Sequence, residues 1–316
     1  MEFSHIPVLL DQCIEGLNID PAGTYIDGTC GGAGHSRVIA SKLSSGGRLI
    51  GIDRDPDAVA TASQRLAEFN RDGVTAQVVH GNYSEIKDIC ERLGIEKVNG
   101  ILLDLGVSSY QLDTGERGFS YHTDAPLDMR MSKEGLSARD IINEYSEEQL
   151  AKILFEYGEE KFSRKIAANI VAEREKKPIE TTLEFAEIIK NSIPAKFRRE
   201  KNPCKKSFQA VRIAVNNEFG HLDRGLDDAF DMLDYGGRLC VITFHSLEDR
   251  IVKQRFDSFC TGCICPPDFP QCVCGRKPRG KLVNRKPIEA DEAELEANAR
   301  SRSAKLRVIE KIEERK

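Results

Sequence analysis

The chain has 316 residues, of which 40% are hydrophobic and 31% are charged, and its formal net charge is −5. This length accommodates a full α/β core with a smaller inserted or appended domain, and the composition is that of an ordinary globular protein. No apolar run approaches the ~20 residues that cross a bilayer, and the start Met1-Glu2 lacks a signal peptide's basic region, so we expect a cytoplasmic protein without membrane partners. The negative net charge argues against a protein that coats nucleic acid, while leaving room for a local basic patch.

The first hundred residues alternate short apolar runs with helical periodicities, which predicts βαβ units around a parallel sheet. Strands are expected at residues 25–27, 49–53, 78–80 and 98–104, the last with the apolar run expected of a central parallel strand. Helices are expected between the strands, and the one after residue 53 begins with Asp55 as its cap and Pro56 at its first position.

The pattern changes between about Gly115 and Lys196, where we find helical signals and no clear strand. Ser146 with Gln149 has the spacing of a capping box, and so has Thr181 with Glu184 at the start of a helix expected to reach residue 193. The α/β pattern then returns with a helix over 222–233 that the glycines at 236–237 end, a strand at 239–244 and a last strand at 305–309.

These signals predict a Rossmann-like α/β fold with an inserted small helical domain. The expected boundaries are residues 1–112 for the first part of the α/β domain, 113–204 for an insert that we expect to bind substrate, and 205–316 for the second part. A cysteine-rich excursion at 256–286 interrupts that second part.

The strongest local signal is the glycine-rich stretch DGTCGGAGH at residues 27–35, where a strand enters a turn and then a helix. Such a turn lets the backbone approach a ligand at the carboxyl edge of the sheet. A dinucleotide-binding G-x-G-x-x-G would end in a small residue, but the corresponding stretch here, GAGHSR at 32–37, ends in Arg37. This departure disfavours a nicotinamide dinucleotide.

S-adenosylmethionine fits the turn better because it carries no phosphate and has a cationic sulfonium, so its site needs carboxylates. Asp27, Asp53 and Asp104 close three of the expected strands, and Asp53 follows Asp27 by 26 positions, which suits a carboxylate that binds ribose hydroxyls. Each aspartate taken alone would more simply be a helix cap or a turn residue. Three of them at corresponding strand ends indicate a site.

At this point the chain resembles a known family, the 16S ribosomal RNA cytosine-N4 methyltransferases, also called the RsmH (MraW) family. The likeness runs nearly end to end, and the stretches at 100–113 and 244–250 are its most specific parts. The shared stretches are HIPVLL at 5–10, YIDGT at 25–29, GHS at 34–36, IDRD at 52–55, GILLDLGVSS at 100–109, QLD at 111–113, RGFS at 117–120, PLDMRM at 126–131, YGEE at 157–160, FQAVRI at 208–213 and FHSLEDR at 244–250.

The resemblance implies a class I S-adenosylmethionine-dependent methyltransferase fold with an inserted helical domain. It implies methylation of the exocyclic N4 of a decoding-region cytosine of 16S rRNA, with the assembled small ribosomal subunit as the partner rather than free RNA. By the same resemblance the cofactor would be contacted by Ala33, Gly34, His35, Asp53, Tyr83, Asp104 and Gln111.

A cytosine exocyclic amine is a poor nucleophile, so the enzyme must align it with the donor methyl and accept its hydrogen bonds. Many methyltransferases that act on the amino groups of DNA bases have an Asp-Pro-Pro-Tyr-like turn after the fourth strand, where this chain has DLGVSS at 104–109. Our candidate catalytic residues are therefore Asp104, Ser108, Ser109 and His245. For His245, contact with the base and a structural hydrogen bond are both open.

Six cations lie within eleven residues near the end of the expected insert: Lys196, Arg198, Arg199, Lys201, Lys205 and Lys206. A solvated charged loop is the simpler interpretation of such a run, but its position near the inferred pocket favours phosphate binding. Our candidate RNA-binding residues are Arg198, Arg199, Lys205, Lys206 and Arg212. A second basic run occupies residues 276–286.

The chain has ten cysteines, for which we expect no disulfides in a reducing compartment. Five of them crowd into residues 260–274, and two C-x-C pairs among these, formed by Cys263, Cys265, Cys272 and Cys274, can supply four thiolates to a structural zinc ion. A reduced loop without metal is the alternative, because the common zinc spacing is C-x-x-C, and the family resemblance does not require a metal.

Two other functions stay open at this stage. One is an S-adenosylmethionine-dependent methyltransferase with another target, such as DNA or protein, and the other is an RNA-binding ribosome assembly factor without activity. The three carboxylates argue against an inactive fold. The sequence does not give the oligomeric state and is compatible with a homodimer.

Overall fold

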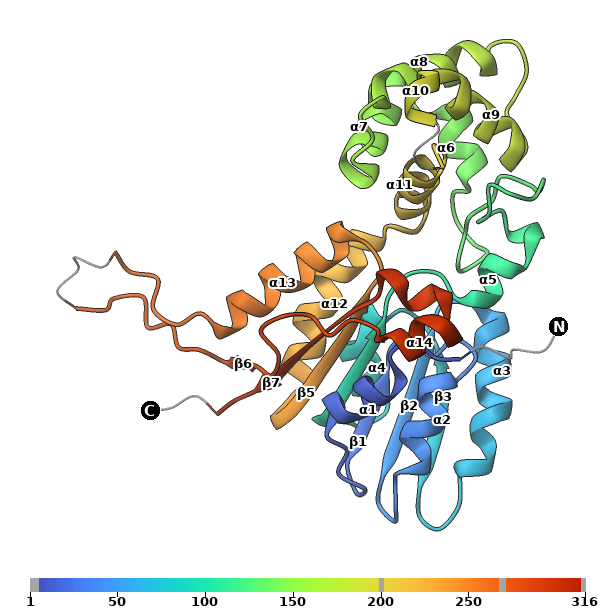
Figure 1. The fold of residues 1–316 in the computed structure, drawn as a ribbon. Coiled ribbons are helices and arrows are strands. Elements are labelled where there is room, and N and C mark those ends of the chain that lie inside the picture. The colour runs from blue at the N-terminus through green and yellow to red at the C-terminus, as the bar shows by residue number, and fades with distance from the viewer. Residues whose placement is uncertain (1–5, 199–201, 267–270, 314–316) are drawn as a thin grey trace. The chain divides into compact units, whose positions relative to one another are not determined.

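The computed structural model describes residues 6–198, 202–266 and 271–313, with the side chain of Arg198 excepted. The chain divides into two compact units. The first combines residues 1–106 and 220–316, and the second consists of residues 107–219 between those two segments (Figure 1). The prediction of an α/β fold interrupted by a helical unit is confirmed.

The first unit is built on a seven-stranded sheet in the order β3-β2-β1-β4-β5-β7-β6. The first five strands are parallel, and β7 and β6 are antiparallel additions at one edge (Figure 1). Strand bounds are β1 Thr24–Asp27, β2 Arg48–Asp53, β3 Thr75–His80, β4 Val98–Asp104, β5 Leu233–Thr243, β6 Gly280–Leu282 and β7 Lys305–Lys311. The strand order reverses between β1 and β4, which is where open α/β sheets bind ligands.

Helices cover both faces of this sheet because successive strand residues point to opposite sides. Tyr25 packs into one buried cluster with residues of α1, α2 and α3, whereas Ile26 packs into the other with residues of α4, α12 and α13. The helix bounds are α1 Leu10–Leu17, α2 Gly34–Ser41, α3 Pro56–Leu66, α4 Ile86–Arg92, α12 Glu218–Met232, α13 Ser246–Cys260 and α14 Glu292–Ala297.

The second unit is helical, with a buried core of its own. Its helices are α5 Ser109–Asp113, α6 Ala138–Glu144, α7 Glu147–Gly158, α8 Ser163–Arg174, α9 Thr182–Ser192, α10 Ala195–Arg198 and α11 Lys205–Asn216. Both predicted capping boxes are present, at the starts of α7 and α9. The unit spans 107–219 rather than the expected 113–204, because residues of α11 such as Phe208 and Val211 are buried in its core.

One expected boundary is wrong. The glycines at 236–237 were expected to end a helix, but α12 ends at Met232 and β5 begins at Leu233. Gly236 has a φ of +82° and the register of β5 on β4 shifts between Val98 and Gly100, so the glycines form an irregularity inside the strand. Among the described residues, no helix is both long and apolar enough to cross a membrane.

Candidate active site

Three carboxylates end three neighbouring strands of the sheet. Asp53 is the last residue of β2, Asp27 of β1 and Asp104 of β4, and these strands are adjacent in the sheet. Asp27 pairs with Gly51 and Leu102, so Asp53 and Asp104 both lie two residues beyond the level of Asp27. The sheet therefore places the three predicted carboxylates along one carboxyl edge, on both sides of its reversal point.

Asp27 faces inward and supports the turn. It is 1% exposed, its Oδ2 accepts a hydrogen bond of 2.5 Å from Ser36 Oγ, and its Oδ1 accepts one of 3.3 Å from the Thr29 amide. Burial raises the pKa of this carboxyl from 3.8 to about 6. Asp27 thus joins the glycine-rich turn to α2.

Asp53 supports the other side of the same turn. Its Oδ2 accepts a 2.8 Å hydrogen bond from the Gly31 amide, and its Oδ1 accepts one of 2.9 Å from the Asp55 amide. Burial raises the pKa of Asp53 from 3.8 to about 6. Each carboxylate oxygen has two acceptor sites, so both can still accept a hydrogen bond from a ligand hydroxyl.

Asp104 differs from the other two because one of its oxygens is unsatisfied. Its Oδ1 is buried and has no hydrogen-bond partner among the described residues, while its Oδ2 lies 3.9 Å from His35 Nδ1. Burial raises the pKa of Asp104 from 3.8 to about 6. Buried polar atoms are nearly always paired in folded proteins, so this oxygen fits a site whose donor comes from a ligand.

The backbone of the turn approaches the sheet edge closely. Ala33, the residue before α2, is in the left-handed region at a φ of +64° and gives the helix no side-chain cap. A Cβ on Gly34 would lie 2.6 Å from the Pro7 ring, so only glycine fits there. The turn is therefore shaped by tight packing, and the residue before α2 does not cap the first amides of that helix.

His35 and Tyr83 are held beside this turn. His35 is 6% exposed, and its Nε2 lies 2.9 Å from the Val8 carbonyl, which can only accept, so Nε2 carries the hydrogen. Tyr83 packs against the sheet core, and added Cβ atoms on Gly28 and Gly225 would lie 3.0 and 2.6 Å from its side chain. Both rings are thus fixed by packing near the predicted cofactor residues.

His245 follows β5, which ends at the same edge as β4. Its Nδ1 accepts a 3.4 Å hydrogen bond from the Glu248 amide, and its Nε2 lies 3.0 Å from the Glu248 carboxylate. Glu248 in turn accepts from the His245 amide at 3.3 Å, which completes a capping box at the start of α13. These contacts favour the structural interpretation of His245.

Comparison with known proteins decides the family. The model of the MraW methylase family matches residues 2–312 of the chain. The chain belongs to the MraW methylase family. It is 57% identical to ribosomal RNA small subunit methyltransferase H 2 of Agathobacter rectalis (98% of this chain, 99% of that one), and 57% identical to ribosomal RNA small subunit methyltransferase H of Brevibacillus brevis (99% of each).

A solved structure described as a putative rRNA methylase from Clostridium thermocellum is also similar. It matches 98% of this chain and 99% of its own, at 11% identity and a TM-score of 0.45. The family supports S-adenosylmethionine as the methyl donor of this MraW methylase.

The helical unit of this MraW methylase holds three more of the predicted site residues, Ser108, Ser109 and Gln111. Ser108 caps α5, Ser109 is the first residue of that helix, and Gln111 is buried with its Oε1 3.1 Å from the Ser108 amide. Gln111 therefore has a local role as half of a capping box. Its contact with the cofactor, and the catalytic roles of Ser108 and Ser109, stay predictions.

The predicted RNA-binding cations have different surroundings. Arg212 makes a two-point ion pair with Glu218 at 2.8 and 2.9 Å, and both side chains are mostly buried, which favours a role inside the helical unit. Lys205 and Lys206 are exposed, and Lys206 Nζ donates to the Glu159 carbonyl at 2.9 Å. Arg199 and Lys201, like His5 of the shared stretches, lie outside the described residues, as does the Arg198 side chain.

Sequence reasoning did not single out two residues that organise the site. The backbone N–H of Asp104 donates a 2.6 Å hydrogen bond to Thr29 Oγ1, and the Ser36 hydroxyl binds Asp27. Both residues lie inside the shared stretches at 25–29 and 34–36. The sequence offered one usable signal, which is that a hydroxyl residue lies close to a glycine at each end of the glycine-rich turn, Thr29 after Gly28 and Ser36 after Gly34.

Proposed function

We propose that this MraW methylase transfers the methyl group of S-adenosylmethionine to the exocyclic N4 of a decoding-region cytosine, cytosine 1402, of 16S rRNA. Its curated relatives are named as methyltransferases of the small-subunit ribosomal RNA. The single observation that supports a cationic ligand best is the buried Asp104 oxygen without a partner, at the edge where Asp27 and Asp53 also end their strands.

The chemistry of these residues fits the proposed cofactor. S-adenosylmethionine carries a sulfonium and an ammonium, and a site with three carboxylates favours positive charge. The carboxyls are costly to ionise where they are buried, as their raised pKa values indicate, and a cation among them offsets that cost. A phosphate-bearing dinucleotide would meet repulsion at the same edge.

Individual residues would then have distinct roles. Asp53 would accept hydrogen bonds from the ribose hydroxyls, and Asp104 would accept one from a donor of the cofactor. The backbone at Ala33, Gly34 and His35 would pass close to the cofactor, with Tyr83 beside it. These roles combine the family resemblance with the partners that each side chain already has in the structure.

The bound cofactor supplies an electrophilic methyl group on a positively charged sulfur. The group would pass to N4 while the sulfur kept the bonding electron pair, and N4 would give up one proton. The chain must hold N4 in line with the methyl group and accept this proton, directly or through water. Among the candidate catalytic residues, Asp104 is assigned to the cofactor and His245 caps α13, which leaves the hydroxyls of Ser108 and Ser109 to accept a hydrogen bond from N4.

The small ribosomal subunit is the proposed partner. We assign the exposed cations Lys205 and Lys206 at the start of α11 to RNA phosphates, because lysines at a surface bind phosphate as point charges. The helical unit would thereby serve the substrate, and the sheet unit the cofactor.

Mass mapping of methylated nucleotides on 16S rRNA from cells without this protein tests the assignment. The proposal expects the decoding-region cytosine to lack its N4 methyl group in these cells, and to regain that group when the chain is expressed again. An unchanged signal would refute the substrate assignment. Binding of radiolabelled S-adenosylmethionine separates this function from that of an inactive assembly factor, which would bind none.

A further inference from the structure

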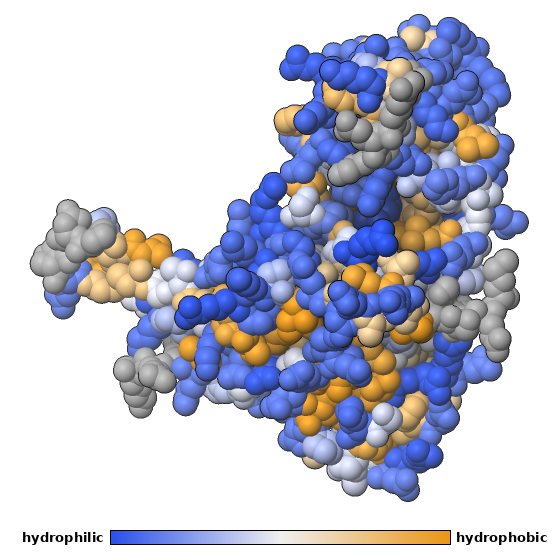
Figure 2. Space-filling view, viewed as in Figure 1, coloured by the Kyte–Doolittle hydropathy of each residue, from blue (hydrophilic) through white to orange (hydrophobic). Residues whose placement is uncertain are grey.

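The segment between α13 and β6 has no hydrophobic core of its own. None of its described residues, 261–266 and 271–279, is buried. In the space-filling view, hydrophobic colour gathers on this segment next to the grey residues, and its exposed apolar side chains are Ile264, at 62%, and Val273, at 74% (Figure 2). Apolar burial therefore does not explain why the segment should hold one conformation.

The base of this segment is anchored to the sheet unit. Arg276 donates to the Ser258 carbonyl at 2.6 Å, and Arg279 pairs with Asp231 at 3.0 Å. The Arg279 guanidinium also lies 5.4 Å from the ring centres of both Phe230 and Phe259, which stack on each other. These contacts hold residues 276–279, and no comparable contact anchors the described residues 263–266 and 271–274, which carry the two C-x-C pairs.

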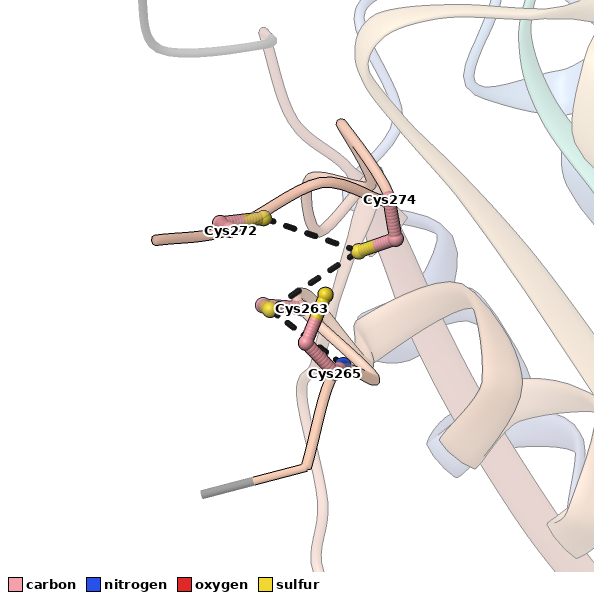
Figure 3. Close-up of side chains that lie close together, drawn as sticks. All are labelled: Cys263, Cys265, Cys272 and Cys274. Atoms are coloured by element: carbon pink, nitrogen blue, oxygen red, sulfur yellow. Dashed lines mark hydrogen bonds between the residues drawn. The ribbon is translucent and has the colours of Figure 1, made fainter. Parts of the chain in front are cut away.

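Four thiols meet in that part. The sulfurs of Cys263, Cys265, Cys272 and Cys274 all lie within 4.8 Å of one another (Figure 3). The Sγ atoms of Cys272 and Cys274 are 3.7 Å apart, as are those of Cys263 and Cys274. The two C-x-C pairs converge from opposite ends of the segment, and Ile264 and Val273, the middle residues of the pairs, are both exposed.

These separations match a thiolate tetrahedron around one metal ion. A zinc–sulfur bond of about 2.3 Å gives a tetrahedron with an edge of about 3.8 Å. A disulfide would bring two sulfurs to about 2.05 Å, and a cluster of several irons would hold its thiolates on different metal atoms and so farther apart. The observed spacing fits a single ion better than either alternative.

Backbone amides support the sulfurs as they do at metal-bound thiolates. The Cys265 amide donates to Cys263 Sγ at 3.4 Å, and the Val273 amide donates to Cys265 Sγ at 3.4 Å. Hydrogen bonds to a ligand atom orient it and stabilise its negative charge. Cys260 lies outside the group, half-buried against the sheet core, so the C-x-x-C formed by Cys260 and Cys263 is not the ligand pair.

We propose that Cys263, Cys265, Cys272 and Cys274 bind one Zn²⁺ ion, which cross-links the segment between α13 and β6. Four protein ligands fill a tetrahedral zinc, so the ion has no open position and its role is structural. The metal takes the place of a hydrophobic core in a segment that buries nothing. This site is independent of methyl transfer, because its residues are not those that carry the proposed function.

The test uses the full-length protein, expressed with zinc in the medium and purified reduced. Elemental analysis should find about one zinc per chain in the wild type and in the matched control Cys260→Ser, and less than about a tenth of that in Cys272→Ser/Cys274→Ser. Cobalt added to chelator-treated wild type should give the intense visible bands of a tetrahedral thiolate site, and the double variant should not.

Hydrogen exchange provides the second readout and shows whether the variants fold. Removing zinc with a chelator should speed exchange in residues 261–279 at least tenfold and leave β4 protected in the wild type and the variants alike. Three results would overturn the proposal: sub-stoichiometric zinc or bound iron in the wild type, equal zinc loss in Cys260→Ser, or an intact mass four daltons lower that reveals two disulfides. Unchanged exchange at 261–279 after complete zinc removal would equally contradict it.

Discussion

The same residue type serves different purposes at the three strand ends. Asp27 is bonded to Ser36 and Thr29, Asp53 to two backbone amides, and Asp104 keeps a buried oxygen open. The sequence predicts that three carboxylates meet at one edge, because parallel strands end there together. It does not predict which of them is already satisfied, since that depends on partners such as Ser36 and Gly31 in other turns.

Replacing Asp53 should weaken S-adenosylmethionine binding. Loss of a hydrogen-bonded carboxylate at a ligand costs about 1.5–3 kcal/mol, so Asp53→Ala should lower the affinity by roughly tenfold to a hundredfold in calorimetry. The same change frees the amides of Gly31 and Asp55, so Asp53→Asn, which keeps an acceptor for one of them, is the matched variant. Wild-type affinity in Asp53→Ala would remove this residue from the cofactor site.

The affinity for S-adenosylmethionine should depend on pH around 6. Burial raises the pKa of Asp27, Asp53 and Asp104 from 3.8 to about 6, so the three carboxyls are ionised above that pH and protonated below it. A cationic ligand favours the ionised form, so binding should weaken as the pH falls from 7 to 5. The stability of the free protein should have the opposite pH dependence. Because the folded protein holds these protons more tightly than the unfolded chain, its free energy of unfolding should fall as pH rises from about 4 to about 6. Calorimetric titrations at pH 5, 6 and 7 with equal affinities would contradict this account.

His245 offers a test that separates capping from catalysis. His245→Ala should destabilise the protein by about 0.5–2 kcal/mol through loss of a helix cap. His245→Asn replaces the ring with another good capping side chain and should restore stability together with methyl transfer. Denaturation curves and initial rates for both variants decide the matter, and a stable but inactive Asn variant would make His245 a catalytic residue.

At the scale of elements, the predictable features were those with a local cause. Apolar runs located the parallel strands, and Ser146 with Gln149 located the start of α7, because a capping box is set by four neighbouring residues. The glycines at 236–237 misled because glycine marks a strand irregularity as well as a helix end, and pairing with β4 decides between them. The strand β6 is three residues long and depends on β7, so its own sequence carries little signal.

The start of α11 should contribute to RNA binding. Lys205→Ala/Lys206→Ala should reduce affinity for the small subunit and flatten its salt dependence. Each lost phosphate contact lowers the slope of log K against log salt concentration by about 0.7–0.9. Lys176→Ala/Lys177→Ala removes two charges from the same helical unit, where both lysines pair with glutamates, and should leave the slope unchanged. Equal slopes for wild type and the α11 variant would show that these lysines do not contact RNA phosphates.

At the scale of the whole molecule, the order of the two units along the chain could be predicted from a change in the hydrophobic pattern, from alternating strand and helix signals to helical signals alone. Residues 1–106 alternate strands and helices, and the described residues of 107–219 form helices and no named strand, so the switch is visible in the sequence. The boundary at 219 is less visible, because α11 has an amphipathic pattern that suits either unit and its buried side chains assign it. The candidate site was likewise predictable in its carboxylates and not in the threonine and serine that hold them.

The central claim is transfer of a methyl group to a cytosine amine, and reconstituted transfer tests it most directly. Purified protein, small ribosomal subunits that lack the modification and S-adenosylmethionine with a deuterated methyl group should yield deuterated N4-methylcytidine in nucleoside mass spectrometry, mapped to the decoding region. Asp104→Ala, prepared in the same way, should yield at most about a hundredth as much, because the open carboxylate oxygen is lost. Deuterium in any other nucleoside, or in none while the protein binds S-adenosylmethionine and the subunit, would contradict the account.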